Sequence, residues 1–97
     1  MRIFSRNTLK VYWEANARAE QQLTAWFAEA EDAKWLSPAD VKAKYGNASI
    51  LKCGRVVFNI CGNEFRLIVS INYEFQAIFI RFIGTHEEYD EIDVQTI

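Results

Sequence analysis

The sequence near residue 86 combines residue types that transfer protons and stabilise negative charge. His86, the only histidine, directly follows the run Arg81-Phe82-Ile83-Gly84-Thr85, and Tyr89 lies three residues further on. Histidine suits proton transfer near neutral pH, and arginine stabilises charge that develops on phosphorus. With Arg66, these residues contain what phosphodiester cleavage needs, and Tyr89 can also stack on a base. Residue types alone leave open that His86 only caps a turn and Tyr89 only packs against a sheet.

A hairpin must place Arg66 among these residues. In the second half of the chain apolar residues recur with a period of two, which is typical of strands. Gly62-Asn63 lies between the β-rich runs 55–60 and 65–73 and predicts a tight turn. A two-residue turn sets Asn59 opposite Arg66.

A second turn around Glu74-Phe75 adds the strand that leads to His86. The register that keeps one face apolar sets Arg66 opposite Ile83 and Arg81 opposite Ile68. The two arginines are then diagonal neighbours whose side chains reach a common point. The predicted apolar face comprises Leu67, Val69, Ile71, Ile78, Ile80 and Phe82.

The first half of the chain predicts helices that cover this apolar face. Arg2-Ile3-Phe4 is a candidate short strand, and Ser5 is a candidate N-cap for a helix with apolar spacing from Leu9 to Trp13. A stronger amphipathic helix is predicted over 19–34. A third helix is expected to start at Ser37-Pro38 and to stop at Gly46-Asn47.

The other face of the sheet is left as the candidate site. Its predicted members are Arg55, Asn59, Arg66, Ser70, Asn72 and Arg81, with Val57, Ile68, Phe79 and Ile83 among them. Arginines on a sheet face are more often surface ion-pair partners than catalysts, so the face alone does not establish chemistry.

Composition narrows the class of protein. The 97 residues are 51% hydrophobic and 14% aromatic, which predicts one globular domain spanning 1–97. We expect neither a signal peptide nor a membrane span. Cys53 and Cys61 are read as small apolar residues of a reducing compartment, because one histidine and two cysteines make a poor metal site.

The net charge of −2 speaks against a nucleic-acid partner only as an average. The last 11 residues hold five acids and no base, whereas residues 1–86 hold 11 bases and 8 acids. We expect the basic charge to concentrate at the sheet, where the local field matters more than the total.

The motifs resemble the HigB-type toxins of bacterial type II toxin–antitoxin modules. The specific motif is Arg81-Phe82-Ile83-Gly84-Thr85-His86-x-x-Tyr89-Asp90-x-Ile92, and the hairpin from Arg55 to Ile68 and Ile71-Asn72-Tyr73 also fit. Upstream, the opening Phe4-Ser5-Arg6 and the run Ala39-Asp40-Val41-Lys42-Ala43 match as well, so that the resemblance covers nearly the whole chain.

The resemblance implies a RelE-like α+β fold, with N-terminal helices packed on one face of a mostly antiparallel sheet of about four strands. It implies a metal-independent, ribosome-dependent mRNA endoribonuclease of the cytoplasm, with no cofactor and no membrane association. The expected partners are the ribosome, mRNA and a HigA-type helix-turn-helix antitoxin, with operator DNA bound only through that antitoxin.

Carried over, the catalytic role falls on Arg66, Arg81, His86 and Tyr89. His86 is expected to transfer a proton, and the two arginines to stabilise charge. Lys52 and Arg55 are expected to contact phosphates, and Asn59 to bind substrate or to orient Arg66. The alternatives are a non-catalytic RNA- or protein-binding module that uses the same basic face, and a degenerate toxin that still binds its antitoxin.

Overall fold

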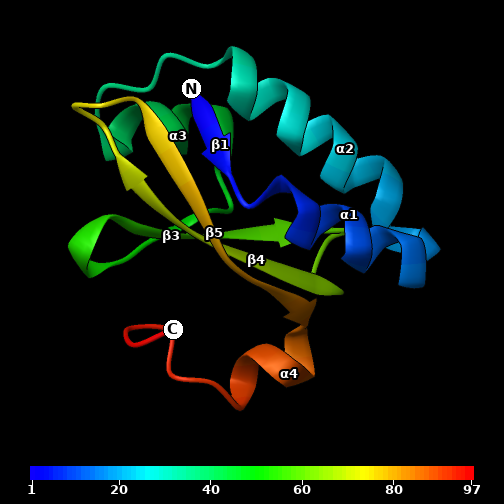
Figure 1. The fold of residues 1–97 in the computed structure, drawn as a ribbon. Helices are drawn as coiled ribbons and strands as arrows, with labels where there is room; N and C mark the ends of the chain where they lie inside the picture. Colours follow the sequence, from blue (N-terminus) through cyan, green and yellow to red (C-terminus); the bar gives the residue numbers. More distant parts are fainter.

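The computed structural model describes residues 1–97 and is built on one five-stranded sheet with the order β1-β5-β4-β3-β2 (Figure 1). The strands are β1 (Arg2–Phe4), β2 (Ser49–Ile50), β3 (Arg55–Ile60), β4 (Phe65–Asn72) and β5 (Ala77–Thr85). β1 runs parallel to β5, and the other neighbours are antiparallel. The predicted α+β class is confirmed. The sheet has one strand more than expected, because the two residues of β2 add an edge to β3.

Four α-helices and one short 3-10 turn complete the fold. They are α1 (Arg6–Ala15), α2 (Ala17–Asp32), α3 (Pro38–Lys44), the turn η1 (Lys52–Gly54) and α4 (His86–Asp90). Helix α3 starts and stops where its Pro and Gly signals predicted. Ser5 precedes α1 but has φ of 71° and makes no side-chain capping bond, so the predicted cap is wrong. None of the helices combines the length and hydropathy of a membrane-spanning segment.

The apolar faces of α1 and α2 bury the side of the sheet that faces them. Leu9, Leu23 and Trp26 are at most 2% exposed, and Trp26 meets Phe58 of β3 edge to face at 5.3 Å between ring centroids. Full burial of such side chains is worth about 1.5–3 kcal/mol each. Trp13 of α1 and Trp26 of α2 are therefore core residues, as their spacing predicted, whereas Phe4 of β1 is exposed.

The first hairpin has the predicted register, with Asn59 opposite Arg66. The second keeps its predicted register only from the turn to the pair Val69–Ile80. A β-bulge follows, so that Ile68 pairs with Phe82, and Arg66 pairs with Gly84. The predicted pairing of Arg66 with Ile83 is therefore wrong.

The bulge exchanges the faces of two side chains in β5. Phe82 moves to the face away from α1 and α2, while Ile83 packs against the core. A Cβ on Gly84 would lie 2.6 Å from the Phe82 ring. Because a real Cβ does not approach a ring this closely, glycine at 84 lets Phe82 lie over the strand.

The face away from α1 and α2 is covered in its middle. Ile68 is 0% and Val57 3% exposed, although neither belongs to the main core. Helix α4 and the C-terminal segment 91–97 lie on this side of the sheet, opposite α1 and α2 (Figure 1). Ile92, Val94 and Ile97 of that segment are half-buried. The second face of the sheet is thus covered in its middle and open to solvent elsewhere.

Candidate active site

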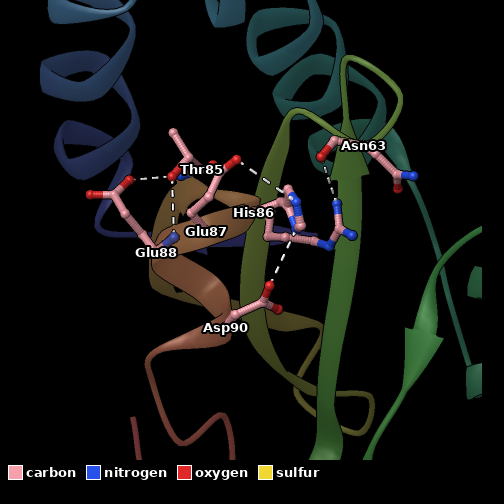
Figure 2. Close-up of polar contacts among 7 residues, drawn as sticks. Asn63, Thr85, His86, Glu87, Glu88 and Asp90 are labelled. Carbon is pink, nitrogen blue, oxygen red and sulfur yellow. Dashed lines mark hydrogen bonds and ion pairs between the residues drawn. The ribbon is translucent and has the colours of Figure 1, made fainter.

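The junction between β5 and α4 is held by a capping box at Thr85. The backbone N–H of Glu88 donates to Thr85 Oγ1 at 3.2 Å, and the backbone N–H of Thr85 donates to Glu88 Oε1 at 2.8 Å. This reciprocal pair satisfies two N–H groups at the start of the helix. It fixes the point at which the chain leaves the sheet and makes His86 the first residue of α4 (Figure 2).

His86 lies between two carboxylates and remains open to solvent. Its Nδ1 is 3.5 Å from Asp90 Oδ2, its Nε2 is 3.8 Å from Glu87 Oε1, and its side chain is 46% exposed (Figure 2). Its backbone N–H donates to the Glu64 carbonyl at 3.1 Å, which ties the helix start to the first hairpin. An accessible imidazole in this setting is suited to giving or taking a proton.

Arg66 and Tyr89 complete this corner of the molecule. Arg66 Nη1 donates to the Asn63 carbonyl at 3.1 Å, and its guanidinium carbon lies 5.7 Å from the centroid of the Tyr89 ring. Tyr89 is half-buried and follows His86 by about one turn of α4. The structure therefore brings three of the four expected catalytic residues to the junction of β4, β5 and α4.

Arg81 lies elsewhere on the same face. Its Nε donates to Ser70 Oγ at 3.3 Å, and its guanidinium carbon lies 5.8 Å from the Phe79 ring centroid. Ser70 is four residues beyond Arg66 on β4, or roughly 13 Å along a strand. The prediction that Arg66 and Arg81 reach a common point is wrong for this arrangement, because Arg81 occupies the bulge and turns towards Ser70.

The three expected RNA-binding residues are also dispersed. Lys52 is exposed in η1 and forms no ion pair. Arg55 is half-buried, and its Nη2 donates to the main-chain oxygen of Ile97 at 2.8 Å. Asn59 Nδ2 donates to the Asn47 carbonyl at 3.2 Å and does not bond Arg66. The expected concentration of basic charge in one cluster is therefore not what the structure shows.

Acidic groups gather close to His86. Glu87 and Asp90 contact its ring, and Glu88 forms the capping box beside it. The pKa of the nearby Tyr12 phenol is raised by burial first, and then by the carboxylates of Glu88 and Glu64. Arg66 is the cation of this corner, so a phosphate at His86 meets both attraction and repulsion.

The cavities of the molecule lie away from His86. One of about 340 Å³ lies between α2, the segment that follows α3, and β3. Another of about 460 Å³ borders Phe79 and Arg81 on the second face of the sheet. Strand alternation predicted Phe79 on that face without singling it out, and the signal that could have done so was Phe4 in the short first strand, its partner in the sheet.

Comparisons with known proteins agree with the motif resemblance. A family model described as "HigB_toxin, RelE-like toxic component of a toxin-antitoxin system" matches residues 19–92. The mRNA interferase toxin HigB of Escherichia coli strain K12 is 28% identical over 92 residues, which cover 93% of this chain and 88% of that protein. The mRNA interferases HigB of Escherichia coli O157:H7 and of Shigella flexneri match to the same extent.

Proposed function

The chain belongs to the HigB family of RelE-like toxins, the toxic components of toxin–antitoxin systems, and from this premise we propose that it is an endoribonuclease that cleaves mRNA during translation. The observation that carries the proposal is the corner where His86, Arg66 and Tyr89 meet. The names of the relatives, mRNA interferases, point to the same chemistry and substrate. Cleavage of translated mRNA stops protein synthesis.

The proposed reaction is attack of a ribose 2′-OH on the adjacent phosphate. A P–O bond forms to the 2′-oxygen and the P–O bond to the 5′-oxygen breaks, which leaves a 2′,3′-cyclic phosphate and a 5′-OH. One proton leaves the 2′-OH and one reaches the 5′-oxygen, and His86 carries one of these transfers. Arg66 stabilises the added negative charge on the phosphorus oxygens. His86 supplies a proton-transfer group and Arg66 supplies positive charge, so we propose that the reaction proceeds without a metal ion.

The charges around His86 support a substrate that the ribosome presents. Free RNA approaching this corner meets the carboxylates of Glu87 and Asp90 as well as Arg66, and the whole chain carries a net charge of −2. Long-range attraction to bulk RNA is therefore weak. An mRNA that the ribosome already holds does not depend on that attraction. Ribosomes translate in the cytoplasm, so we propose that the protein acts there.

A toxin of this family has an antitoxin, and we propose that it is a HigA-type helix-turn-helix protein. That protein, and not the toxin, would contact operator DNA. Co-expression with the product of the neighbouring gene is expected to abolish growth arrest and to yield a complex that purifies intact. Arrest that persists with that product present would contradict this assignment.

A reconstituted translation system tests the proposed reaction. We expect the purified protein to cut a defined mRNA when ribosomes translate it and to leave the same mRNA intact when ribosomes are omitted. The products should carry 2′,3′-cyclic phosphates, and EDTA should not prevent cleavage of an mRNA already held on purified ribosomes in a buffer with polyamines. Efficient cleavage of free RNA would contradict ribosome dependence, and 3′-OH products would contradict attack by the 2′-OH.

The second candidate function is binding of RNA or protein without cleavage. The observation that favours it is the pair of carboxylates that flank His86, which oppose the approach of a phosphate. Both functions predict weaker ribosome binding when Arg66 or Arg81 is neutralised. Only the enzyme predicts new RNA ends that disappear when His86 is replaced.

A further inference from the structure

Two phenylalanines form an exposed pair on the second face of the sheet, on the side away from α1 and α2. Phe4 of β1 pairs with Phe79 of β5, and their rings stack at 4.9 Å between centroids with 12° between planes. Phe4 is 38% and Phe79 37% exposed. Their neighbours Ile3 and Ile78 point into the core, which places both rings on the opposite face. Two adjacent rings that each keep more than a third of their surface exposed make this edge of the sheet a candidate contact site.

An arginine lies against each ring of the pair. The guanidinium carbon of Arg2 is 5.3 Å from the Phe4 centroid, and that of Arg81 is 5.8 Å from the Phe79 centroid. Both arginines are exposed, and neither forms an ion pair, although Arg2 lines a hollow with Glu31 and Asp32 and Arg81 donates to Ser70. The four residues make one row across β1 and β5, in the order Arg2, Phe4, Phe79, Arg81.

A hollow of about 460 Å³ adjoins the Phe79 end of this row. Its walls include the side chains of Ser70, Asn72 and Arg81, which supply hydrogen-bonding groups beside the ring. Glu74 is the only acid that lines it. A carboxylate disfavours a phosphate in the hollow but not an uncharged base, so the lining suits a base inside and its phosphate at the arginines.

We propose that the Arg2–Phe4–Phe79–Arg81 row and its hollow hold an unpaired nucleotide of the RNA substrate. The base takes the place of the Arg81 guanidinium against the Phe79 ring, and Arg81 turns with Arg2 to the phosphate. The inference rests on the proposed function and adds a binding site to it. Proteins that bind single-stranded RNA combine aromatic rings for the bases with cations for the backbone, and this row offers both.

The site lies at a distance from the bond that is cut. Phe79 precedes Thr85, the last residue of β5, by six residues, or roughly 20 Å of strand, and His86 follows Thr85. The nucleotide held there is therefore several positions from the scissile phosphate. The row contributes to binding of the RNA, whereas the residues at the His86 corner contribute to the cleavage reaction.

Binding of an RNA that cannot be cleaved tests the site separately from catalysis. The probe is a fluorescently labelled, unstructured 12-nucleotide RNA with 2′-O-methyl riboses, measured by anisotropy at low salt. Phe79→Leu is expected to weaken binding roughly tenfold, because leucine removes the aromatic ring on which the base stacks. Phe75→Leu is the matched control, since Phe75 is 72% exposed at the β4–β5 turn and lies outside the row.

A second probe of equal length and charge, with abasic 2′-O-methyl residues throughout, separates stacking from structural damage. Wild type and Phe79→Leu are expected to bind it equally, because no base remains to stack. Equal binding of the first probe by wild type and Phe79→Leu overturns the proposal, as does a wild type that does not bind it. A tenfold loss that persists with the abasic probe also overturns it.

Two further outcomes assign the row to another partner. If Phe79→Leu weakens binding to ribosomes free of mRNA but not binding to the first probe, the row contacts ribosomal RNA. A loss of antitoxin affinity alone assigns it to the antitoxin. Both overturn the proposal. Mapping of mRNA cleavage in cells reports on the proposed function by itself, so the two failures are distinguishable.

Discussion

At the scale of single residues, the chemistry proposed here rests on His86 and on the two side chains beside it. The imidazole is exposed at the start of α4 and held between Asp90 and Glu87. Arg66 lies over Tyr89 instead of beside Arg81, so one arginine and not two is placed to neutralise a phosphate at this corner. Arg81 belongs to the aromatic row, where we propose that it contacts the RNA backbone at a distance from the reacting phosphate.

Replacing His86 tests its role in proton transfer. We expect His86→Gln to lower the rate of mRNA cleavage on ribosomes by about 10²–10⁴-fold, because glutamine keeps the polarity but not the proton exchange. Thermal unfolding and antitoxin binding should match the wild type, since the side chain is exposed and its ion pairs are with Glu87 and Asp90. Activity within threefold of wild type would move the proton transfer to another group.

Two substitutions of Tyr89 test whether its ring or its hydroxyl contributes to cleavage. The ring lies below the guanidinium of Arg66, and the hydroxyl makes no hydrogen bond in the structure. We expect Tyr89→Phe to keep cleavage within a fewfold of wild type and Tyr89→Ala to reduce it strongly, because only alanine removes the support of Arg66. A large loss with Tyr89→Phe would instead make the phenol a proton donor or acceptor.

At the scale of elements, the sequence predicted the hairpins but not the bulge in β5. Alternation and the Gly62-Asn63 turn set the β3–β4 register, and the same reasoning holds in β4–β5 as far as Val69 and Ile80. Alternation assumes that no residue is skipped. The position of the extra residue, Arg81, is set by the packing of Phe82 and Ile83 on opposite faces of the sheet. That packing depends on the tertiary structure and is not visible in the alternation.

Gly84 connects this bulge to the start of α4. A Cβ there would lie 2.6 Å from the Phe82 ring and 3.0 Å from Glu88 Oε1 of the capping box. We expect Gly84→Ala to destabilise the fold by about 1–3 kcal/mol in urea denaturation and to lower cleavage by shifting His86. Gly46→Ala is the matched control, because its Cβ would meet nothing within 4 Å. Equal stability of the two variants would show that Phe82 moves freely.

The C-terminal segment 91–97 lies on the second face of the sheet and is bonded to it at Arg55 (Figure 1). Ile68 and Val57 are buried on the face away from α1 and α2, and Arg55 donates to the main chain at Ile97. We expect deletion of residues 92–97 to lower the free energy of unfolding by about 2 kcal/mol through exposure of these two side chains. Gln95→Ala, an exposed change in the same segment, should leave it within about 0.5 kcal/mol. Identical urea midpoints for the deletion and the wild type would show that the segment does not pack there.

At the scale of the whole molecule, charge is distributed rather than concentrated. The sequence indicated that the acids lie near the C-terminus, but it did not show that α4 brings them beside His86. The expected basic cluster separates into Arg66 at the corner, Arg81 in the aromatic row and Arg55 under the C-terminal segment. The residue types of the corner were predictable from the motif. The separation of the three arginines depends on where each long side chain finds a hydrogen-bond or ring partner, and strand alternation does not predict this.

Mapping mRNA ends in cells tests the central claim most directly. Brief induction of the wild-type chain without its antitoxin is expected to produce new 5′-OH ends inside translated regions. Induction of His86→Gln to the same protein level should produce none, and a message without a start codon should stay intact in both cases. New ends that are absent in the wild type, or equally abundant with His86→Gln, would contradict the proposal that this corner cleaves translated mRNA.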